Sequence, residues 1–238
     1  MASFWTMAAA EEARGATRPF VVAIDGPSGV GKSTLAHALA VELGLPHVNT
    51  GLMYRALADL ALRRRVDLAD GPALGALAQA MTFVLDEGSP RQLLIEGGPP
   101  SASLWSDEVE AVVSSVASHP EVREAMRDAQ RRLGAGGAVM EGRDIGTVVF
   151  PDAVVKILLE APSDVRAGRR IRERGGGDEV ARAVDRRDAL DARTNPLEPA
   201  PDAHVIDTTS LGPDEVLAES LRIVRGAAGP TAGQGAES

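Results

Sequence analysis

Cysteine is absent from this chain, and aromatic residues are scarce. Without cysteine, neither a disulfide framework nor a thiolate metal site can form. Aromatic residues make up 3% of the 238 residues whereas hydrophobic residues make up 44%, so the core must be built mainly from aliphatic side chains. The four histidines (His37, His47, His119 and His204) are scattered and show no metal-ligand spacing. The composition therefore indicates an ordinary globular protein without cysteine chemistry.

Long hydrophobic runs and an excess of positive charge are also missing. No apolar run approaches the roughly 18 residues that a membrane span needs. The net charge of −9 argues against general nucleic-acid binding through a basic surface. Residues 1–18 contain two acids and no uninterrupted apolar core, so they do not resemble a secretory signal. We therefore expect a cytoplasmic, monomeric protein with no nucleic-acid or membrane partner.

The chain length suits one α/β domain, or one α/β domain with inserted subdomains. We expect this domain to span residues 19–226 and to be flanked by disordered tails at 1–18 and 227–238, the latter small and polar.

A glycine-rich segment lies between the apolar run Phe20–Ile24 and a helical pattern that begins near Leu35. It has the form G-x-x-x-x-G-K-[ST], in the strand–turn–helix context that gives this motif its meaning. Backbone N–H groups of such a loop, together with the helix N-terminus, bind phosphate groups. The expected nucleotide-binding residues are Gly26, Pro27, Ser28, Gly29, Val30, Gly31, Lys32, Ser33 and Thr34. Lys32 can reach the β- and γ-phosphates and the Ser33 hydroxyl can bind Mg²⁺, so the motif predicts nucleoside triphosphate binding.

The remaining pattern alternates strand-like and helical segments, which predicts a parallel sheet wrapped by helices. Strands are expected at 138–140, 154–159 and 204–206, and helices at 54–64, 72–80, 107–117, 121–133, 163–172, 178–191 and 213–224. Thr50 is the expected N-cap of the first of these helices. Three short runs, at 81–86, 91–96 and 99–104, predict a small antiparallel insert.

Glu141-Gly142-Arg143-Asp144 follows a buried strand, where open α/β sheets place ligands. Arg143 could bind a phosphate through its bidentate fork, while one of the acids meets a polar base or Mg²⁺. The alternative is a charged turn with a local ion pair.

Further arginines stand in helical segments. Arg55 and Arg123 would each suit an exposed helix face, and for Arg123 the sequence alone favours that interpretation. Arg166, Arg169 and Arg170 belong to a basic cluster that ends before Gly175-Gly176-Gly177. This pattern favours an arginine-rich lid at about 166–180, with these three arginines as catalytic residues, because phosphoryl transfer needs charge stabilisation and exclusion of water. A solvated basic face is the alternative.

Together these features resemble the cytidylate kinases of the nucleoside-monophosphate kinase family. The resemblance covers about residues 20–225 and includes the glycine loop, Thr50-Gly51-Leu52-Met53-Tyr54-Arg55, and the run from Glu141 to Ala153. The segment from Glu141 to Pro151 is its most specific part.

The resemblance implies a P-loop kinase that uses ATP and Mg²⁺ to phosphorylate CMP and dCMP, with a monophosphate-binding insert at about 66–112. It implies that Arg55 and Arg143 hold the acceptor phosphate near Thr50, and that Ser114, Arg123 and Asp144 recognise cytosine. It also assigns Arg187 and Asp191 to the ribose and Arg193 to the phosphate. Arg193 stands only three residues before Pro196, one fewer than in the family pattern, so a lower acceptor affinity is expected.

Three other functions remain open at this point. The acceptor could be UMP, AMP or a small alcohol; the protein could hydrolyse nucleotide as a switch; or it could bind nucleotide as a scaffold. No N-K-x-D motif for guanine is present. Several converging arginines argue against the scaffold, because they would repel one another without a bound phosphate.

Overall fold

The computed structural model describes residues 20–174, 177, 189–190 and 197–227. The expected N-terminal tail and nearly all of the C-terminal tail lie outside these ranges, as do most of the predicted helix at 178–191 and part of the predicted lid. None of the helices in the described ranges combines the length and apolar character needed to cross a membrane.

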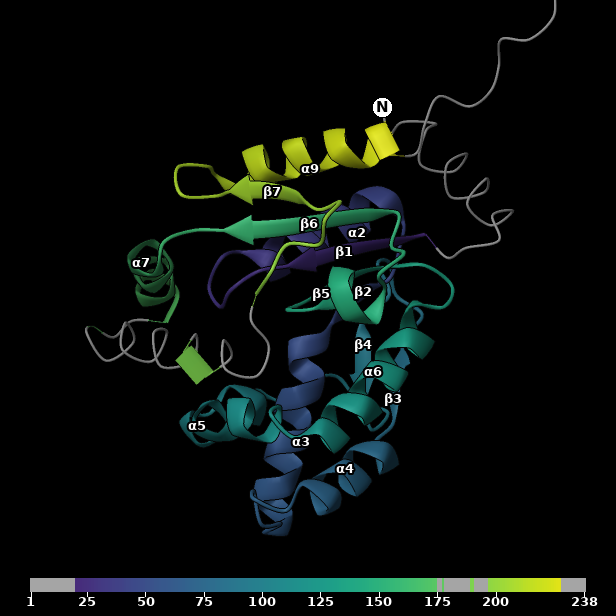
Figure 1. Ribbon diagram of the computed structural model, residues 1–238, viewed down its shortest axis with the longest axis vertical. Coiled ribbons are helices and arrows are strands. Elements are labelled where there is room, and N and C mark those ends of the chain that lie inside the picture. The colour runs from purple at the N-terminus through teal and green to yellow at the C-terminus, as the bar shows by residue number, and fades with distance from the viewer. Residues whose placement is uncertain (1–19, 175–176, 178–188, 191–196, 228–238) are drawn as a thin grey trace, which may run out of the picture.

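A parallel sheet wrapped by helices forms the centre of the molecule, as predicted (Figure 1). It has five strands, and the strand at residues 47–49 was not predicted from the sequence. Its strands lie in the order β2-β5-β1-β6-β7. Their bounds are β1 Val21–Asp25, β2 His47–Asn49, β5 Ala138–Gly142, β6 Val155–Glu160 and β7 His204–Asp207. Every residue of β1 and β5 is buried, which explains why both strands begin with an uninterrupted series of apolar residues.

Alternate residues of β1 face two different cores. Val22 and Ile24 pack with α2 (Lys32–Leu43) and α9 (Pro213–Ala227) on one face. Val21 and Ala23 pack on the opposite face, mainly against β5 and η2 (Ile145–Val149), a single π-helical turn. This alternation follows from the two-residue period of a strand.

The helices α3 to α6 form a second lobe with its own aliphatic core. Figure 1 shows this lobe beneath the sheet. Its helices are α3 Thr50–Arg64, α4 Gly71–Ala80, α5 Asp107–Val116 and α6 Pro120–Gly134. The predicted antiparallel insert is present here as β3 (Phe83–Leu85) paired with β4 (Leu93–Ile95).

Two local predictions are wrong. Residues 99–104 do not form a strand; they lead into the 3-10 turn η1 (Ala102–Trp105), because Pro99-Pro100 offers no N–H to a ladder and the Ser101 side chain accepts from Ser103 N. Asn49, not Thr50, caps α3 by accepting from Leu52 N at 3.3 Å. The Thr50 hydroxyl instead donates to the Glu141 carbonyl oxygen at 2.7 Å.

Helix α7 (Ser163–Arg174) follows β6 and lies near the carboxyl ends of the strands (Figure 1). The register pairs Asp25 with Gly142 and Asn49 with Glu141, so the polar ends of β1, β5 and β2 meet at one edge of the sheet. The fold therefore gathers the glycine loop and the Glu141–Asp144 segment in one place.

Candidate active site

The glycine loop between β1 and α2 takes a conformation that requires glycine. Gly31, which precedes α2, has a φ of 105°, in a region that L-residues rarely adopt. A Cβ on Gly26 would lie 2.7 Å from the Leu159 carbonyl oxygen. Lys32 Nζ donates to the carbonyl oxygens of Gly26 and Pro27 at 2.7 and 2.8 Å. The loop is thus a preformed turn that carries its ammonium group at the start of a helix, where anions bind.

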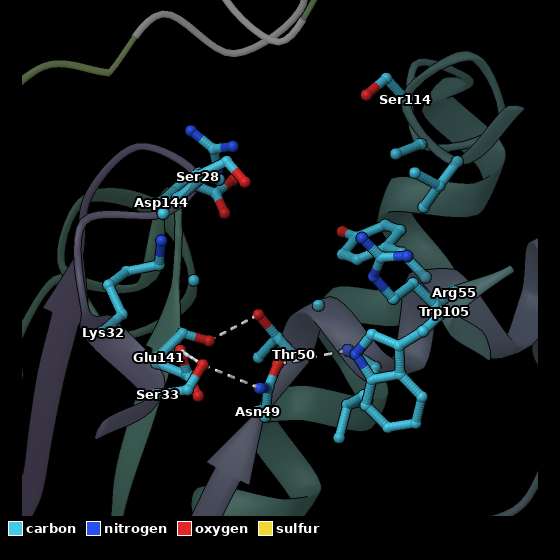
Figure 2. Close-up of a pocket in the computed structure, with 18 of the residues that line it drawn as sticks. Ser28, Lys32, Ser33, Asn49, Thr50, Arg55, Trp105, Ser114, Glu141 and Asp144 are labelled. Carbon is cyan, nitrogen blue, oxygen red and sulfur yellow. Dashed lines mark hydrogen bonds between the residues drawn. The ribbon is translucent and has the colours of Figure 1, made fainter. Parts of the chain in front are cut away.

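Glu141 is the acid that lies next to Ser33. Ser33 Oγ donates to Glu141 Oε2 at 2.8 Å, and Asn49 Nδ2 donates to Ser33 Oγ at 3.3 Å. His47 Nε2 lies 3.1 Å from Glu141 Oε1. Figure 2 shows Ser33, Asn49 and Glu141 grouped below Lys32. The sequence left open whether Glu141 or Asp144 would lie nearer the site expected for Mg²⁺ at the Ser33 hydroxyl, and Glu141 is the acid that contacts this hydroxyl.

Asp25 is a buried acid that holds the segment after β5. Its carboxylate accepts from Ile145 N at 2.9 Å and from Gly146 N at 2.8 Å. Burial raises the pKa of Asp25 from 3.8 to about 6, although these two backbone hydrogen bonds lower it. Asp25 therefore fixes the π turn that immediately follows Asp144.

The raised pKa of Asp25 predicts how stability changes with pH. Because the pKa is higher in the folded state, the Asp25 contribution is fully present below about pH 3.8 and is lost as the pH rises through about 6. The free energy of unfolding of the wild type relative to Asp25→Asn is thus expected to fall between pH 4 and pH 7. Thermal melts of both proteins across this range test it; a constant difference would contradict the assignment.

A cavity of about 420 Å³ opens between the glycine loop and the helical lobe. Figure 2 shows Lys32, Ser33 and Glu141 on the sheet side and Arg55, Trp105 and Ser114 on the helical side. The structure brings most of the predicted site residues into its lining: Ser28, Gly29, Gly31, Lys32, Ser33, Thr34, Thr50, Arg55, Ser114, Arg123, Arg143, Asp144 and Arg170. Five cationic side chains in an acidic protein make this cavity suited to an anionic ligand.

Two of these arginines are held by carboxylates. Arg55 is buried, donates to the Leu104 carbonyl oxygen at 2.9 Å and forms a salt bridge with Glu110. Arg123 Nη2 donates to Asp144 Oδ2 at 2.9 Å. Arg123 therefore does not lie on a solvated helix face, as its sequence context alone favoured, but in the cavity wall.

The three arginines that the sequence assigns to a lid have different surroundings. Arg166 is buried and donates to the carbonyl oxygens of Ala161 and Ser28, both at 2.9 Å. Arg169 donates to the Val30 carbonyl oxygen at 3.2 Å and to Thr208. Only Arg170 of the three lines the cavity, and it donates to Ser28 Oγ at 2.6 Å. Arg166 and Arg169 thus support the loop backbone, and a catalytic role for them stays a prediction.

A second cavity, of about 680 Å³, lies on the other side of the loop. It shares Gly31 and Thr34 with the first cavity and is also lined by Val30, Arg169 and the turn after β7. Gly26 and Pro27 line neither cavity, although their carbonyl oxygens hold Lys32.

Some predicted residues cannot be placed, and others were missed. Arg187, Asp191 and Arg193 lie outside the described residues. Sequence reasoning missed the contact between His47 and Glu141, which joins residues 94 positions apart, and the place of Trp105 in the cavity. A histidine at the end of a short strand and a lone tryptophan carry no local signal for either role.

Comparison with known proteins agrees with this geometry. Residues 22–226 match the family model described as Cytidylate kinase. A cytidylate kinase from Desulfitobacterium hafniense (strain Y51) is 43% identical over 211 residues, which cover 85% of this chain and 91% of that protein. Cytidylate kinases from Shouchella clausii (strain KSM-K16) and Nocardia farcinica (strain IFM 10152) are 42% and 43% identical to this chain. Each alignment covers 87% of this chain, together with 96% of the Shouchella protein and 94% of the Nocardia protein. The chain therefore belongs to the cytidylate kinase family and is a nucleotide-binding kinase.

Proposed function

We propose that this enzyme transfers the γ-phosphoryl group of ATP to CMP and dCMP, giving ADP with CDP or dCDP. The observation that carries the proposal is one cavity lined by both the phosphate-loop residues Lys32 and Ser33 and the Arg123–Asp144 pair. The first two residues suit a triphosphate, and the pair suits a base with a donor and acceptors side by side.

Cytosine matches the hydrogen-bonding groups of the Arg123–Asp144 pair in the cavity lining. Its exocyclic amine is a donor, which a carboxylate oxygen of Asp144 can accept, and its O2 and N3 are acceptors for Arg123. Ser114, from α5, lines the same cavity and offers a hydroxyl. Uracil presents an acceptor in place of the amine and a donor at N3, so it would leave these partly buried polar groups without matching partners.

The acceptor phosphate would lie between the base-reading pair and the loop, held by Arg55 and Arg143. One of its oxygens attacks the γ-phosphorus of ATP, the bond from that phosphorus to the bridging oxygen breaks, and the bridging oxygen leaves with ADP. No general base is needed, because the attacking oxygen is already anionic. Lys32 and Arg170 would stabilise the charge that spreads over the transferred group.

The residues next to Lys32 fit a Mg²⁺ ion. Mg²⁺ prefers oxygen ligands and is bound in such sites by one or two carboxylates or hydroxyls together with substrate phosphates. Ser33 and Glu141 provide a hydroxyl and a carboxylate 2.8 Å apart. No group of three or more potential metal-ligating side chains occurs in the described part of the chain. When bound, the ion would neutralise charge on the phosphates.

Glu141→Gln is expected to raise the free Mg²⁺ concentration for half-maximal activity about tenfold, since it removes the negative charge while keeping the size of the side chain. Activity titrated with Mg²⁺ at saturating substrates measures this shift. An unchanged Mg²⁺ dependence would contradict the role of Glu141.

We assign the nucleoside part of ATP to the second cavity. This cavity shares Gly31 and Thr34 with the first, so a donor there could extend its phosphates over the loop toward the acceptor. Roles for Arg187, Asp191 and Arg193 at the acceptor, the 66–112 insert, the monomeric state and the cytoplasmic location stay predictions.

Phosphorus NMR of a mixture of enzyme, Mg²⁺, ATP and CMP tests the proposed reaction. CDP and ADP are expected to appear in equal amounts. Inorganic phosphate in place of CDP would mean hydrolysis and would contradict the proposal.

A further inference from the structure

Two arginines of α6 share one oxygen of Asp144. Arg123 Nη2 donates to Asp144 Oδ2 at 2.9 Å, and Arg127 Nη2 lies 3.5 Å from the same atom. The two arginines are four residues apart, so they project from the same face of the helix. Arg123 lines the cavity, whereas Arg127 is not part of the lining that the described residues form. Asp144 thus forms one ion pair with an arginine that lines the cavity and one with an arginine that does not.

One hydrogen-bond donor of the Arg127 guanidinium group is not used among the described residues. Its Nε is buried and has no hydrogen-bond partner among the described residues. A buried donor without an acceptor is costly, so its presence calls for an explanation. Its Nη2 contact with Asp144 is longer than an ordinary hydrogen bond. A small movement toward Asp144 could therefore strengthen the contact of Arg127 with this carboxylate.

The other groups that face Asp144 cannot replace a cation. Tyr54, from α3, is partly buried and hydrogen-bonded to Gln130; desolvation raises its pKa to about 12, so its hydroxyl stays neutral. Asp25, from β1, interacts electrostatically with Asp144 and brings a second carboxyl group. Among the described residues, Arg123 and Arg127 are the cations that form ion pairs with the Asp144 carboxylate.

The proposed role of Arg123 in binding cytosine conflicts with its ion pair with Asp144. To recognise cytosine, Arg123 must turn its donors toward O2 and N3, and in doing so it weakens its contact with Asp144. At that moment Asp144 must accept from the exocyclic amine while losing its shortest cationic contact in a partly dehydrated cavity. Such a carboxylate without a partner is strongly disfavoured.

We propose that Arg127 is a positioning residue for base recognition: it holds Oδ2 of Asp144 so that Oδ1 can accept from the cytosine amine and Arg123 can turn to the base. This inference rests on the proposed function. Arg127 itself touches neither substrate, so its loss should weaken CMP binding and leave the transfer step nearly intact.

Three variants on α6 test the proposal, with CMP and ATP binding measured by calorimetry. Arg127→Met keeps the apolar stem and is expected to raise the Kd for CMP about tenfold, the order expected for losing a charged contact. Its kcat at saturating CMP and its Kd for ATP should stay within about twofold of the wild type, because the loop is untouched. Arg127→Lys, which keeps the charge, is expected to bind CMP within about threefold of the wild type. Arg132→Met, the same change at an exposed site of this helix, should change neither constant.

The outcomes separate this inference from the proposed function. If the wild type phosphorylates CMP but Arg127→Met binds CMP normally, the inference is wrong and the function stands. If Arg127→Met and Arg127→Lys lose CMP binding, ATP binding and kcat together, the role of Arg127 is merely structural and the inference also fails. If the wild type neither binds nor phosphorylates CMP, the proposed function fails and the inference falls with it.

Discussion

Replacing Lys32 by Ala is expected to lower kcat for CMP phosphorylation about a thousandfold, which abolishes activity in a routine assay. A preorganised charge at the transferred group acts mainly on the transition state, and removing one such group typically costs two to three orders of magnitude in rate, roughly. The Lys32 ammonium now rests on the carbonyl oxygens of Gly26 and Pro27, within the loop that would surround the phosphates. Steady-state kinetics with saturating ATP and CMP measure the effect.

The fold should survive this change. The Lys32 side chain is partly buried and lies at the start of α2. It belongs to none of the three hydrophobic cores, so its replacement by Ala leaves their packing unchanged. The far-ultraviolet circular dichroism spectrum and the melting temperature should stay close to those of the wild type. Near-normal turnover in a folded Lys32→Ala protein would contradict the role given to this residue.

The second large effect is expected at Asp144. Asp144→Asn replaces an acceptor-only carboxylate by an amide, which can accept from the cytosine amine with its oxygen or donate to uracil O4 with its nitrogen. We expect the preference for CMP over UMP, as the ratio of kcat/KM values, to fall about a thousandfold, because a site that pairs polar groups with one base discriminates by roughly four orders of magnitude. Most of this change should come from a lower kcat/KM for CMP rather than from a higher kcat/KM for UMP.

Asp128→Asn provides the matched control. Asp128 lies on α6 as an exposed acid, so the same change of charge there should leave the preference unaltered. If Asp144→Asn discriminates between CMP and UMP as well as the wild type does, then base recognition does not depend on Asp144.

The parts of the fold that the sequence predicted are those with local causes. The glycine loop has a strict spacing, and Gly31 adopts the positive φ that only glycine tolerates easily. The buried strands β1 and β5 begin with apolar runs that end at Ile24 and Met140. Helix α2 ends at Leu43 and is capped by Gly44, whose φ is 63°. Each of these features has a signal within a few consecutive residues of the sequence.

The parts that the sequence did not predict depend on contacts between distant residues. His47 and Glu141 meet because β2 pairs with β5, and no spacing in the sequence encodes that pairing. Arg166 resembles a lid residue by its charge, yet it donates to the Ser28 carbonyl oxygen 138 residues away. An arginine that supports a backbone and one that binds a ligand look alike in a sequence, since both need only a charged fork.

The position of Arg123 also could not be predicted from its local sequence. Its helical context favoured a solvated position, but the ion pair with Asp144 and the cavity wall give it a defined place. Only the resemblance to the cytidylate kinases indicated Arg123 as a site residue from the sequence. Its role in recognising cytosine stays a prediction.

The most direct test of the account is the release of ADP by the wild-type protein with Mg²⁺, ATP and one of five acceptors: CMP, dCMP, UMP, AMP or GMP. The account predicts rapid release with CMP and dCMP and little with the other three or with no acceptor. Release without an acceptor, or equal release with all five, would contradict it, because the Arg123–Asp144 pair would then not select the substrate.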